Sequence, residues 1–184
     1  MSQIILIIFY ILAGILSLTA IALIMSLIVL MILRVPFVRT PKRAIAALVK
    51  SGLITEKDLV FDLGAGDGKF LHELVKVTHC HAEGFEISPF FWFLGEVRAA
   101  MSKRWKMHLQ NFLHIDLSEP TVIFTFLAPA GLPTLNQKLK NEVRPETLII
   151  SYGFQLEGFN LQQVIDLRPD NPKGSKFYIY KKIV

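Results

Sequence analysis

The sequence predicts an α/β fold: a doubly wound, mostly parallel sheet that ends in an antiparallel hairpin and is preceded by one transmembrane helix. Short apolar runs alternate with segments in which apolar residues recur at helical spacing, a pattern typical of parallel strands covered by helices on both faces. A glycine-rich turn at residues 64–68 directly follows the first apolar run of this pattern. The N-terminal 33 residues stand apart as one long apolar stretch.

This apolar stretch predicts a membrane anchor. Residues 4–33 contain no charged side chain and are mostly isoleucine and leucine. About 18 such residues suggest a span, and a helix of this length reaches about 45 Å against a hydrocarbon core of about 30 Å. A cleaved signal peptide would begin with basic residues and have a shorter apolar core, whereas residues 1–3 carry no basic side chain. We therefore expect a single-pass anchor over residues 1–34.

The whole net charge of +5 lies next to the anchor. Residues 1–55 hold no acid and five of the 20 basic residues, which leaves fifteen basic and all fifteen acidic residues in 56–184. The five are Arg34, Arg39, Lys42, Arg43 and Lys50. Such juxtamembrane charge predicts that the domain lies on the cytoplasmic side. A nucleic-acid binder would spread its basic residues over the folded domain, so we expect no nucleic-acid partner.

These features divide the chain into an anchor (1–34), a basic segment with a pre-domain helix (35–55) and a ligand-binding domain (56–184). Small residues in the anchor would let two copies approach, so weak homodimerisation stays open. They are Ala13, Ser17, Ala22 and Ser26. The lone Cys80 excludes an intramolecular disulfide, and the five histidines lack metal-ligand spacing, so we expect no metal.

The elements of the domain follow from the apolar pattern. Thr40 is expected to cap a helix with Pro41 as its first residue and Gly52 near its end. Further helices are expected behind the glycine turn, from Ser88-Pro89, and along residues 132–143. Strands are expected at 59–63, 82–87, 107–110, 122–127 and 147–151, with the closing hairpin at 161–167 and 177–181.

The glycine-rich turn carries the strongest indication of chemistry. Asp62 ends the first strand, and Gly64, Gly66 and Gly68 follow at alternate positions before a helix, which lets backbone lie against a ligand. A dinucleotide site would place its third glycine one residue later, and Asp67 would repel phosphate. The turn suits a cationic ligand without phosphate, such as S-adenosylmethionine, whose ammonium and sulfonium the two acids would complement. The alternative is a turn that serves only tight packing.

Two polar residues end the next strands. Glu86 lies at the end of the second strand, where a carboxylate can accept both hydroxyls of a ribose. Its alternative is a solvated glutamate at a strand end. Asn111 ends the third strand and could contact the adenine edge. These positions extend the predicted site from the methionine part of the ligand to its nucleoside.

The motif Asp-Leu-Gly-Ala-Gly-Asp-Gly at 62–68, followed by Gly-Phe-Glu-Ile-Ser-Pro at 84–89 and an aromatic run at 90–93, resembles class I methyltransferases, which are Rossmann-like. More narrowly, residues 35–41 (Val-Pro-Phe-Val-Arg-Thr-Pro) directly after a membrane helix resemble the small anchored protein-lysine methyltransferases. Mitochondrial members of that group modify the ATP synthase c-subunit and the adenine nucleotide translocase. The similarity covers nearly the whole chain, including residues 124–129 and the helix that contains Lys138.

The resemblance implies contacts between S-adenosylmethionine and Thr40, Asp62, Gly64, Gly66 and Glu86. The complete set of cofactor-binding candidates adds Ala65, Asp67, Gly68, Ile87 and Asn111. The chain departs from the group at two positions. Arg39 stands where proline is common, and Asn111 stands where aspartate is common, which keeps hydrogen bonding but loses charge.

The expected activity is methylation of a lysine side chain of a membrane protein. The reaction requires a neutral amine held in line with the methyl group, and an apolar mouth lowers the pKa of the amine. Phe37, Phe126 and Pro129 are the candidates for that mouth, and no general base is assigned. Residues 126–129 lack the Asn/Asp-Pro-Pro-aromatic arrangement that holds a base amine, which disfavours nucleic-acid substrates. The alternatives are a methyltransferase of a quinone or lipid and a non-catalytic scaffold.

Overall fold

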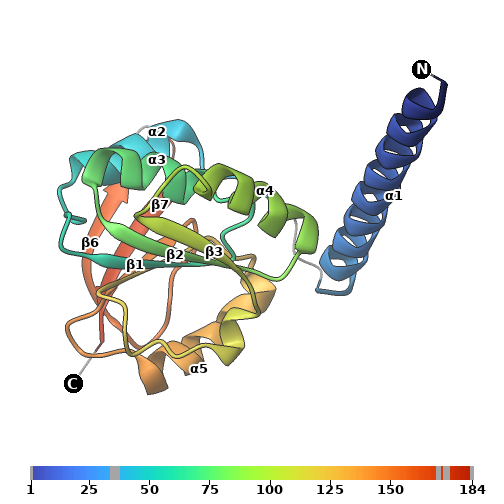
Figure 1. The fold of residues 1–184 in the computed structure, drawn as a ribbon. Coiled ribbons are helices and arrows are strands. Elements are labelled where there is room, and N and C mark those ends of the chain that lie inside the picture. The colour runs from blue at the N-terminus through green and yellow to red at the C-terminus, as the bar shows by residue number, and fades with distance from the viewer. Residues whose placement is uncertain (1, 34–37, 169–170, 172–174, 183–184) are drawn as a thin grey trace.

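The computed structural model describes residues 2–33, 38–168, 171 and 175–182. In these residues one long helix precedes a sheet flanked by helices (Figure 1). The helices are α1 (Ser2–Leu33), α2 (Lys42–Lys50), α3 (Lys69–Thr78), α4 (Pro89–Ala99) and α5 (Leu132–Glu142), with short 3-10 turns η1 (Phe112–His114) and η2 (Pro129–Gly131). The strands are β1 (Leu59–Leu63), β2 (His81–Glu86), β3 (Trp105–Leu109), β4 (Val122–Thr125), β5 (Leu148–Tyr152), β6 (Asn160–Asp166) and β7 (Lys176–Lys181).

The sheet has seven strands in the order β3-β2-β1-β4-β5-β7-β6. Strands β1 to β5 run parallel, and β7 is antiparallel to both β5 and β6. The strand order reverses between β1 and β4, so a crevice opens at the carboxyl ends of these strands, where doubly wound folds bind ligands. The predicted fold class, including the closing antiparallel hairpin, is confirmed.

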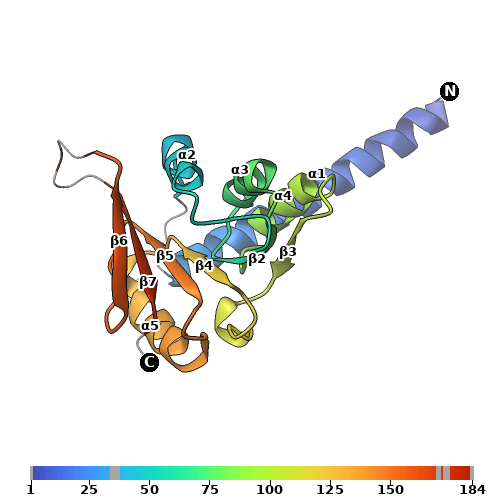
Figure 2. The same cartoon turned by 90° about the vertical axis from the view of Figure 1, so that its left-hand side faces the viewer.

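Alternate residues of the central strands pack into two separate cores. Val60 and Phe124 lie in the core beneath α2 and α3, whereas their neighbours Phe61 and Ile123 lie in the core with residues of α5. This alternation arises because successive strand residues point to opposite faces of a sheet. Figure 2 shows the three layers, with α2, α3 and α4 on one face and α5 on the other. The sheet is thus covered on both sides, as the continuous apolar strands require.

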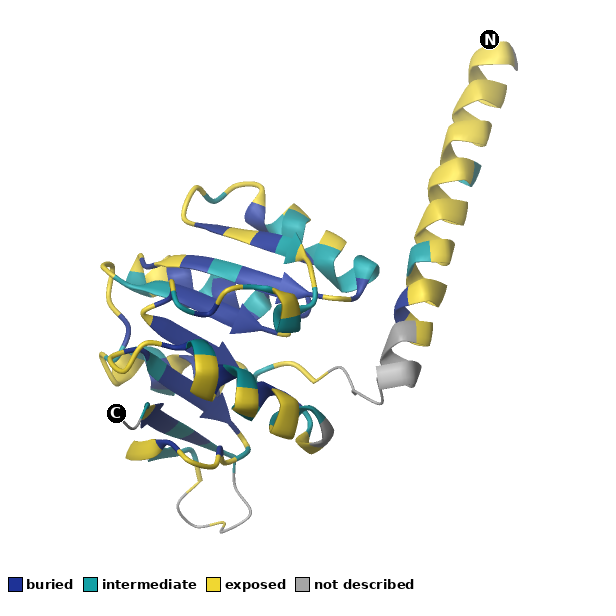
Figure 3. Ribbon diagram, turned by 90° about the horizontal axis from the view of Figure 1, so that it is seen from below, coloured by how far each residue is buried: buried dark blue, intermediate teal, exposed yellow. Residues whose placement is uncertain are grey.

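The N-terminal helix α1 is apolar and exposed. Its segment Gln3–Ile28 has a mean hydropathy of 2.8 and is, by length and composition, able to cross a membrane, a test that a signal sequence would also pass. Large apolar side chains such as Leu16 and Leu18 are exposed on it. Figure 3 shows the exposed N-terminal half of α1 projecting beyond the rest of the chain.

The C-terminal part of α1 packs on α4. The hydroxyl oxygen of Ser26 accepts the backbone N–H of Phe90 at 3.0 Å, while the Ser26 hydroxyl donates to the Ala22 carbonyl at 2.8 Å. Ser88 accepts the next amide of α4, that of Phe91. Two orphan N–H groups at the start of α4 are therefore capped, one by its own N-cap and one by α1. Ser26, considered above for pairing between anchors, is buried in this contact.

The predicted cap of the pre-domain helix is wrong by one residue. The N-cap of α2 is Pro41, with φ −62° and ψ 145°, and its carbonyl accepts the N–H groups of Ala44 and Ile45. Thr40 precedes a proline, which favours an extended backbone over a helical one. Its side chain makes no cap, and the residue instead lines the cavity described below.

Candidate cofactor-binding and active site

A cavity of about 310 Å³ opens at the carboxyl ends of the parallel strands. Most of its wall is formed by four segments at or just after the carboxyl ends of strands β1 to β4 and by the segment before α2. These segments are residues 64–67, 85–87, 110–113, 126–128 and 38–40. The remaining lining residues are Lys69 and Phe70 of α3, Phe91 of α4, Gly131 of η2 and Thr134 of α5. The topology thus gathers segments from distant parts of the sequence at the switch point of the sheet.

The glycine-rich loop after β1 presents its backbone to this cavity. The N–H groups of Gly64 and Ala65 both donate to the Phe85 carbonyl, at 2.9 and 3.0 Å, which ties the loop to the end of β2. Gly66 has φ +57°, a left-handed conformation that side chains with a Cβ disfavour. Its N–H donates to Glu86 Oε2 at 2.8 Å. The loop is therefore held in one shape by the strand beside it.

Gly68 has a different structural role from Gly64 and Gly66. It is the N-cap of α3, with φ +68°, and does not line the cavity. A Cβ at this position would lie 2.9 Å from the ring of Trp105 on β3. Gly68 thus permits close packing of α3 on the sheet, while Gly64, Ala65 and Gly66 form the cavity wall.

Glu86 is fixed at the cavity by two backbone amides. Its Oε1 accepts the N–H of Ser88 at 2.7 Å, and its Oε2 accepts that of Gly66 at 2.8 Å. Burial raises the pKa of Glu86, and these backbone hydrogen bonds oppose the rise. Each carboxylate oxygen keeps a second lone pair, so the group can still accept hydrogen bonds from a ligand diol. The carboxylate is positioned before any ligand arrives.

Asp62 lies near the end of β1 and is buried. Burial, followed by the nearby charge of Glu86, raises the pKa of Asp62 well above its usual value. Asp62 is not part of the cavity wall. A cation bound nearby would favour the ionised form of both Asp62 and Glu86. The preference for a cationic ligand and direct contact between Asp62 and that ligand both stay predictions.

Asp67 is neutralised by two arginines. Its Oδ2 accepts hydrogen bonds from Arg39 Nε at 3.1 Å and Nη2 at 2.8 Å, and lies 3.3 Å from Arg98 Nη2. The side chain of Asp67 is 3% exposed, whereas that of Arg39 is 54% exposed. Arg98 also donates to the Asp67 carbonyl. Arg39 and Asp67 line the cavity, whereas Arg98 does not, so the Asp67 carboxylate is already paired with two guanidinium groups at the cavity wall.

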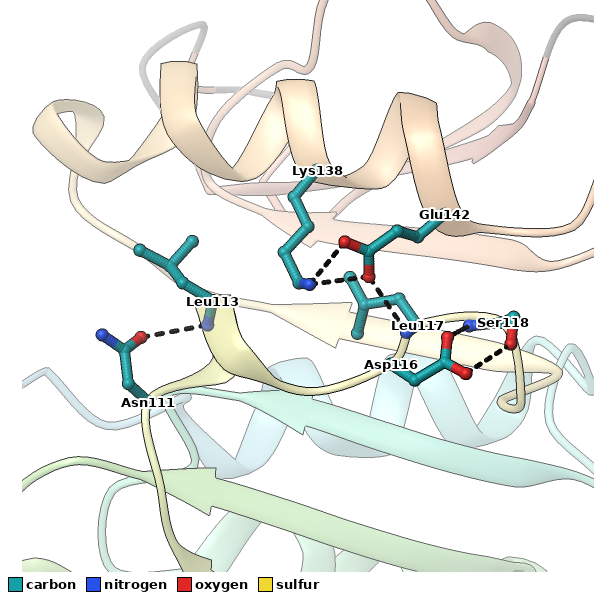
Figure 4. A network of polar contacts seen from close by, with 7 residues as sticks. All are labelled: Asn111, Leu113, Asp116, Leu117, Ser118, Lys138 and Glu142. Carbon is teal, nitrogen blue, oxygen red and sulfur yellow. Dashed lines mark hydrogen bonds and ion pairs between the residues drawn. The ribbon is translucent and has the colours of Figure 1, made fainter.

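The wall that follows β3 is held by a polar network shown in Figure 4. Asn111 Oδ1 accepts the N–H of Leu113 at 3.0 Å, so the side-chain amide nitrogen is not used in this bond. Further along, Glu142 of α5 accepts the N–H of Leu117 at 3.3 Å and pairs with Lys138 at 2.6 Å. The connection from β3 to β4 is thus fastened to α5. Ile87, exposed at 36%, also lines the cavity.

The segment after β4 contributes an apolar wall. Phe126 lines the cavity and packs edge-on against Tyr152 at a centroid distance of 4.7 Å. Pro129 starts η2 and does not line the cavity, whereas the preceding Ala128 does. Phe37 lies outside the described residues. Of the two mouth candidates that the structure describes, Phe126 lies at the cavity and Pro129 does not.

Several cavity residues had no place in the predicted site. Val38 and Arg39 reach it because the segment before α2 folds back over the glycine loop. Phe112 and Leu113 directly follow Asn111, so their position next to a strand end was an available signal. Thr134 comes from α5, and its place depends on how that helix packs. No local pattern marked it.

The sheet with antiparallel β7, the glycine loop after β1 and the buried acid at the end of β2 define a class I methyltransferase dependent on S-adenosylmethionine. A sequence profile described as the ANTKMT methyltransferase domain matches residues 62–163, more than half of the chain. The chain belongs to this family. The similarity that residues 62–68 and 84–89 indicated is thereby confirmed.

Individual relatives agree with this assignment. A curated protein-lysine N-methyltransferase of Saccharolobus islandicus (strain REY15A) is 30% identical over 155 residues, covering 79% of this chain and 92% of the relative. An RNA methyltransferase from Salinibacter ruber, solved with S-adenosyl-L-homocysteine, has a TM-score of 0.69 at 22% identity, covering 78% of this chain and 93% of that one. Precorrin-6y C5,15-methyltransferase from Geobacter metallireducens GS-15 has a TM-score of 0.60 at 11% identity, covering 79% and 90%. The two structures show a shared fold.

Proposed function

We propose that the chain methylates a lysine side chain of a membrane protein. The observation that carries this proposal is the 30% identity to a protein-lysine N-methyltransferase along 92% of that relative. The structural neighbours act on RNA and on a precorrin, which illustrates that this fold alone does not select a substrate. The proposal therefore depends on the sequence relative and on the site.

The cofactor would occupy the cavity with its ribose on Glu86 and its methionine part on the glycine loop. Both oxygens of Glu86 retain lone pairs for the ribose hydroxyls. Asn111 and Ile87 would flank the adenine, because they belong to the wall beside Glu86. Arg39 would bind the methionine carboxylate, since it lines the cavity and a guanidinium has five N–H donors, enough to contact a second carboxylate besides Asp67. Thr40 would complete the same wall.

The acceptor amine would enter along the apolar side of the cavity. Val38, Phe126 and Leu127 line that side. Transfer of an ammonium group into such surroundings lowers its pKa, because burial disfavours the charged form. A neutral lysine held in line with the sulfonium methyl group then needs no covalent enzyme intermediate, and the acceleration comes from orientation.

A membrane tether would bring the domain to its substrate. We propose that residues 1–34 form a single-pass anchor, 35–55 a basic connection with α2, and 56–184 the catalytic domain on the cytoplasmic side. Support comes from the exposed apolar helix α1 and from the exposed basic residues Lys42 and Arg43 close behind it. Confinement to the membrane plane raises the effective concentration of a membrane-embedded acceptor.

The test is the fate of a labelled methyl group. Full-length protein and methyl-labelled S-adenosylmethionine are added to membranes, and label is followed into protein and into the organic extract. We expect label in protein, recovered as methyl-lysine after hydrolysis. Glu86→Gln should strongly reduce it at limiting cofactor, while Glu146→Gln, a change at an exposed glutamate away from the cavity, should not. Label confined to the organic extract would refute the lysine proposal and indicate a quinone or lipid acceptor.

A further inference from the structure

Helix α4 is apolar on its outer face as well as on the face toward the sheet. Gly95 and Ala99 are buried inward. Phe93 and Val97, four residues apart on the opposite side, are 52% and 60% exposed, and Met101, in the turn just after the end of α4, is 98% exposed. A helix that covers a sheet normally presents polar residues to water. We call Phe93, Val97 and Met101 the α4 outer face.

The two charged residues of α4 make contacts with the rest of the domain and are not part of the α4 outer face. Glu96 Oε1 accepts the backbone N–H of Met107 on β3 at 3.1 Å. Arg98 pairs with Asp67 of the glycine loop and donates to its carbonyl. Both charged side chains of this helix are thus used in contacts with the domain. The exposed side of α4 is left with apolar groups, an arrangement that water disfavours.

The first turn of α4 lies next to α1. The contact between Ser26 and Phe90 joins the C-terminal part of α1 to the first turn of α4. In Figure 2, α4 and the connection from it to β3 lie at the side of the domain from which the N-terminal part of α1 projects. A bilayer around the projecting part of α1 would meet that side first. Lys103 and Arg104, in this connection and exposed, are suited to anionic headgroups.

We propose that the α4 outer face sits in the lipid interface beside α1, with the bilayer as its occupant. The inference rests on the proposed membrane tether and adds a second membrane contact to it. An apolar helix face enters the boundary between headgroups and acyl chains by about 5–10 Å. With α1 and α4 both held, the domain cannot rotate freely about its anchor. The cavity therefore has a set orientation to the membrane.

The test measures depth in the bilayer at single labelled cysteines. Full-length protein in liposomes of neutral and anionic phospholipids carries a fluorophore at Val97→Cys or Met101→Cys, and brominated lipids quench it. The native Cys80 is buried, so unsubstituted protein is the labelling control. Val77→Cys on α3 is a matched position, because Val77 is 58% exposed, close to the 60% of Val97. Ile15→Cys reports on α1 itself.

We expect quenching at Val97 and Met101 to exceed that at Val77 by at least about twofold, given the depth of an interfacial helix. Val97→Glu should reduce quenching of a label at Met101, whereas Val77→Glu should not. Equal quenching at Val97 and Val77 with strong quenching at Ile15 would overturn the α4 proposal and leave the tether intact. A label at Val97 that responds to protein concentration or to an added acceptor protein, but not to brominated lipid, would also overturn it. Loss of quenching at Ile15 would count against the tether itself.

Discussion

Replacement of Glu86 by glutamine separates its part in the fold from its part in cofactor binding. Glutamine has nearly the same shape, but its amide nitrogen donates and cannot accept. Either the N–H of Gly66 or that of Ser88 therefore loses its acceptor. An unsatisfied buried N–H costs about 1–3 kcal/mol, and removal of a buried charge offsets part of this cost. We expect the free energy of unfolding to fall by about 1 kcal/mol.

The loss of cofactor affinity should be larger than the loss of stability. A bidentate, charge-assisted contact to the ribose diol contributes on the order of 2–4 kcal/mol, which is roughly a 30- to 1000-fold rise in Kd. Isothermal titration with S-adenosylmethionine gives Kd, and urea unfolding gives the stability of the same preparation. Glu146→Gln is the control at an exposed site. A folded Glu86→Gln variant whose Kd stays within about twofold of the native value would refute the assigned ribose contact.

Four further outcomes are expected. Burial raises the pKa of Asp62, so above about pH 4 the folded state keeps a proton that the unfolded chain has released. The free energy of unfolding should therefore fall as pH rises from about 4 through the raised pKa. Asp62→Asn should flatten this pH dependence, measured by urea unfolding. Arg39→Ala should weaken cofactor binding about tenfold by titration, with Lys42→Ala unchanged; equal affinities would exclude the carboxylate contact. Gly66→Val should cost at least about 1–2 kcal/mol of stability and block binding, because its φ is +57°; native affinity would contradict this. Deletion of residues 1–33 removes the Ser26 cap of α4, which should lower the free energy of unfolding by about 1 kcal/mol. Cofactor affinity should be nearly unchanged, while methylation of a membrane acceptor should fall. Loss of cofactor affinity would show that α1 is part of the fold.

The local sequence predicted those parts of the site that depend on one strand and the turn after it. The acid at the end of β1, the alternating glycines and Glu86 could all be located because short-range patterns determine a strand, a turn and a helix. The order of the elements then followed from their alternation. Strand and helix ends differed by one or two residues, as for β4, which ends at Thr125 rather than at residue 127.

The sequence pattern could not predict contacts between residues far apart in the chain. Arg39 was visible only as a departure from a related group, and its pairing with Asp67 spans 28 residues. The bond between Ser26 and Phe90 spans 64 residues and joins an apparent tether to the domain. Asp67 was expected to face a cation, but two arginines already neutralise it. Such pairings depend on how elements pack in three dimensions, which periodicity does not encode.

The short connection between α1 and the cavity sets a limit on reach. Val38 lines the cavity and lies five positions after Leu33, the last residue of α1. Five residues of chain extend to at most about 18 Å. If α1 ends at the bilayer surface, the methyl donor cannot stand much further than this from the lipid. The enzyme would then reach lysines of a membrane substrate that lie close to the bilayer, and it would not reach lysines on parts of the substrate far from the bilayer.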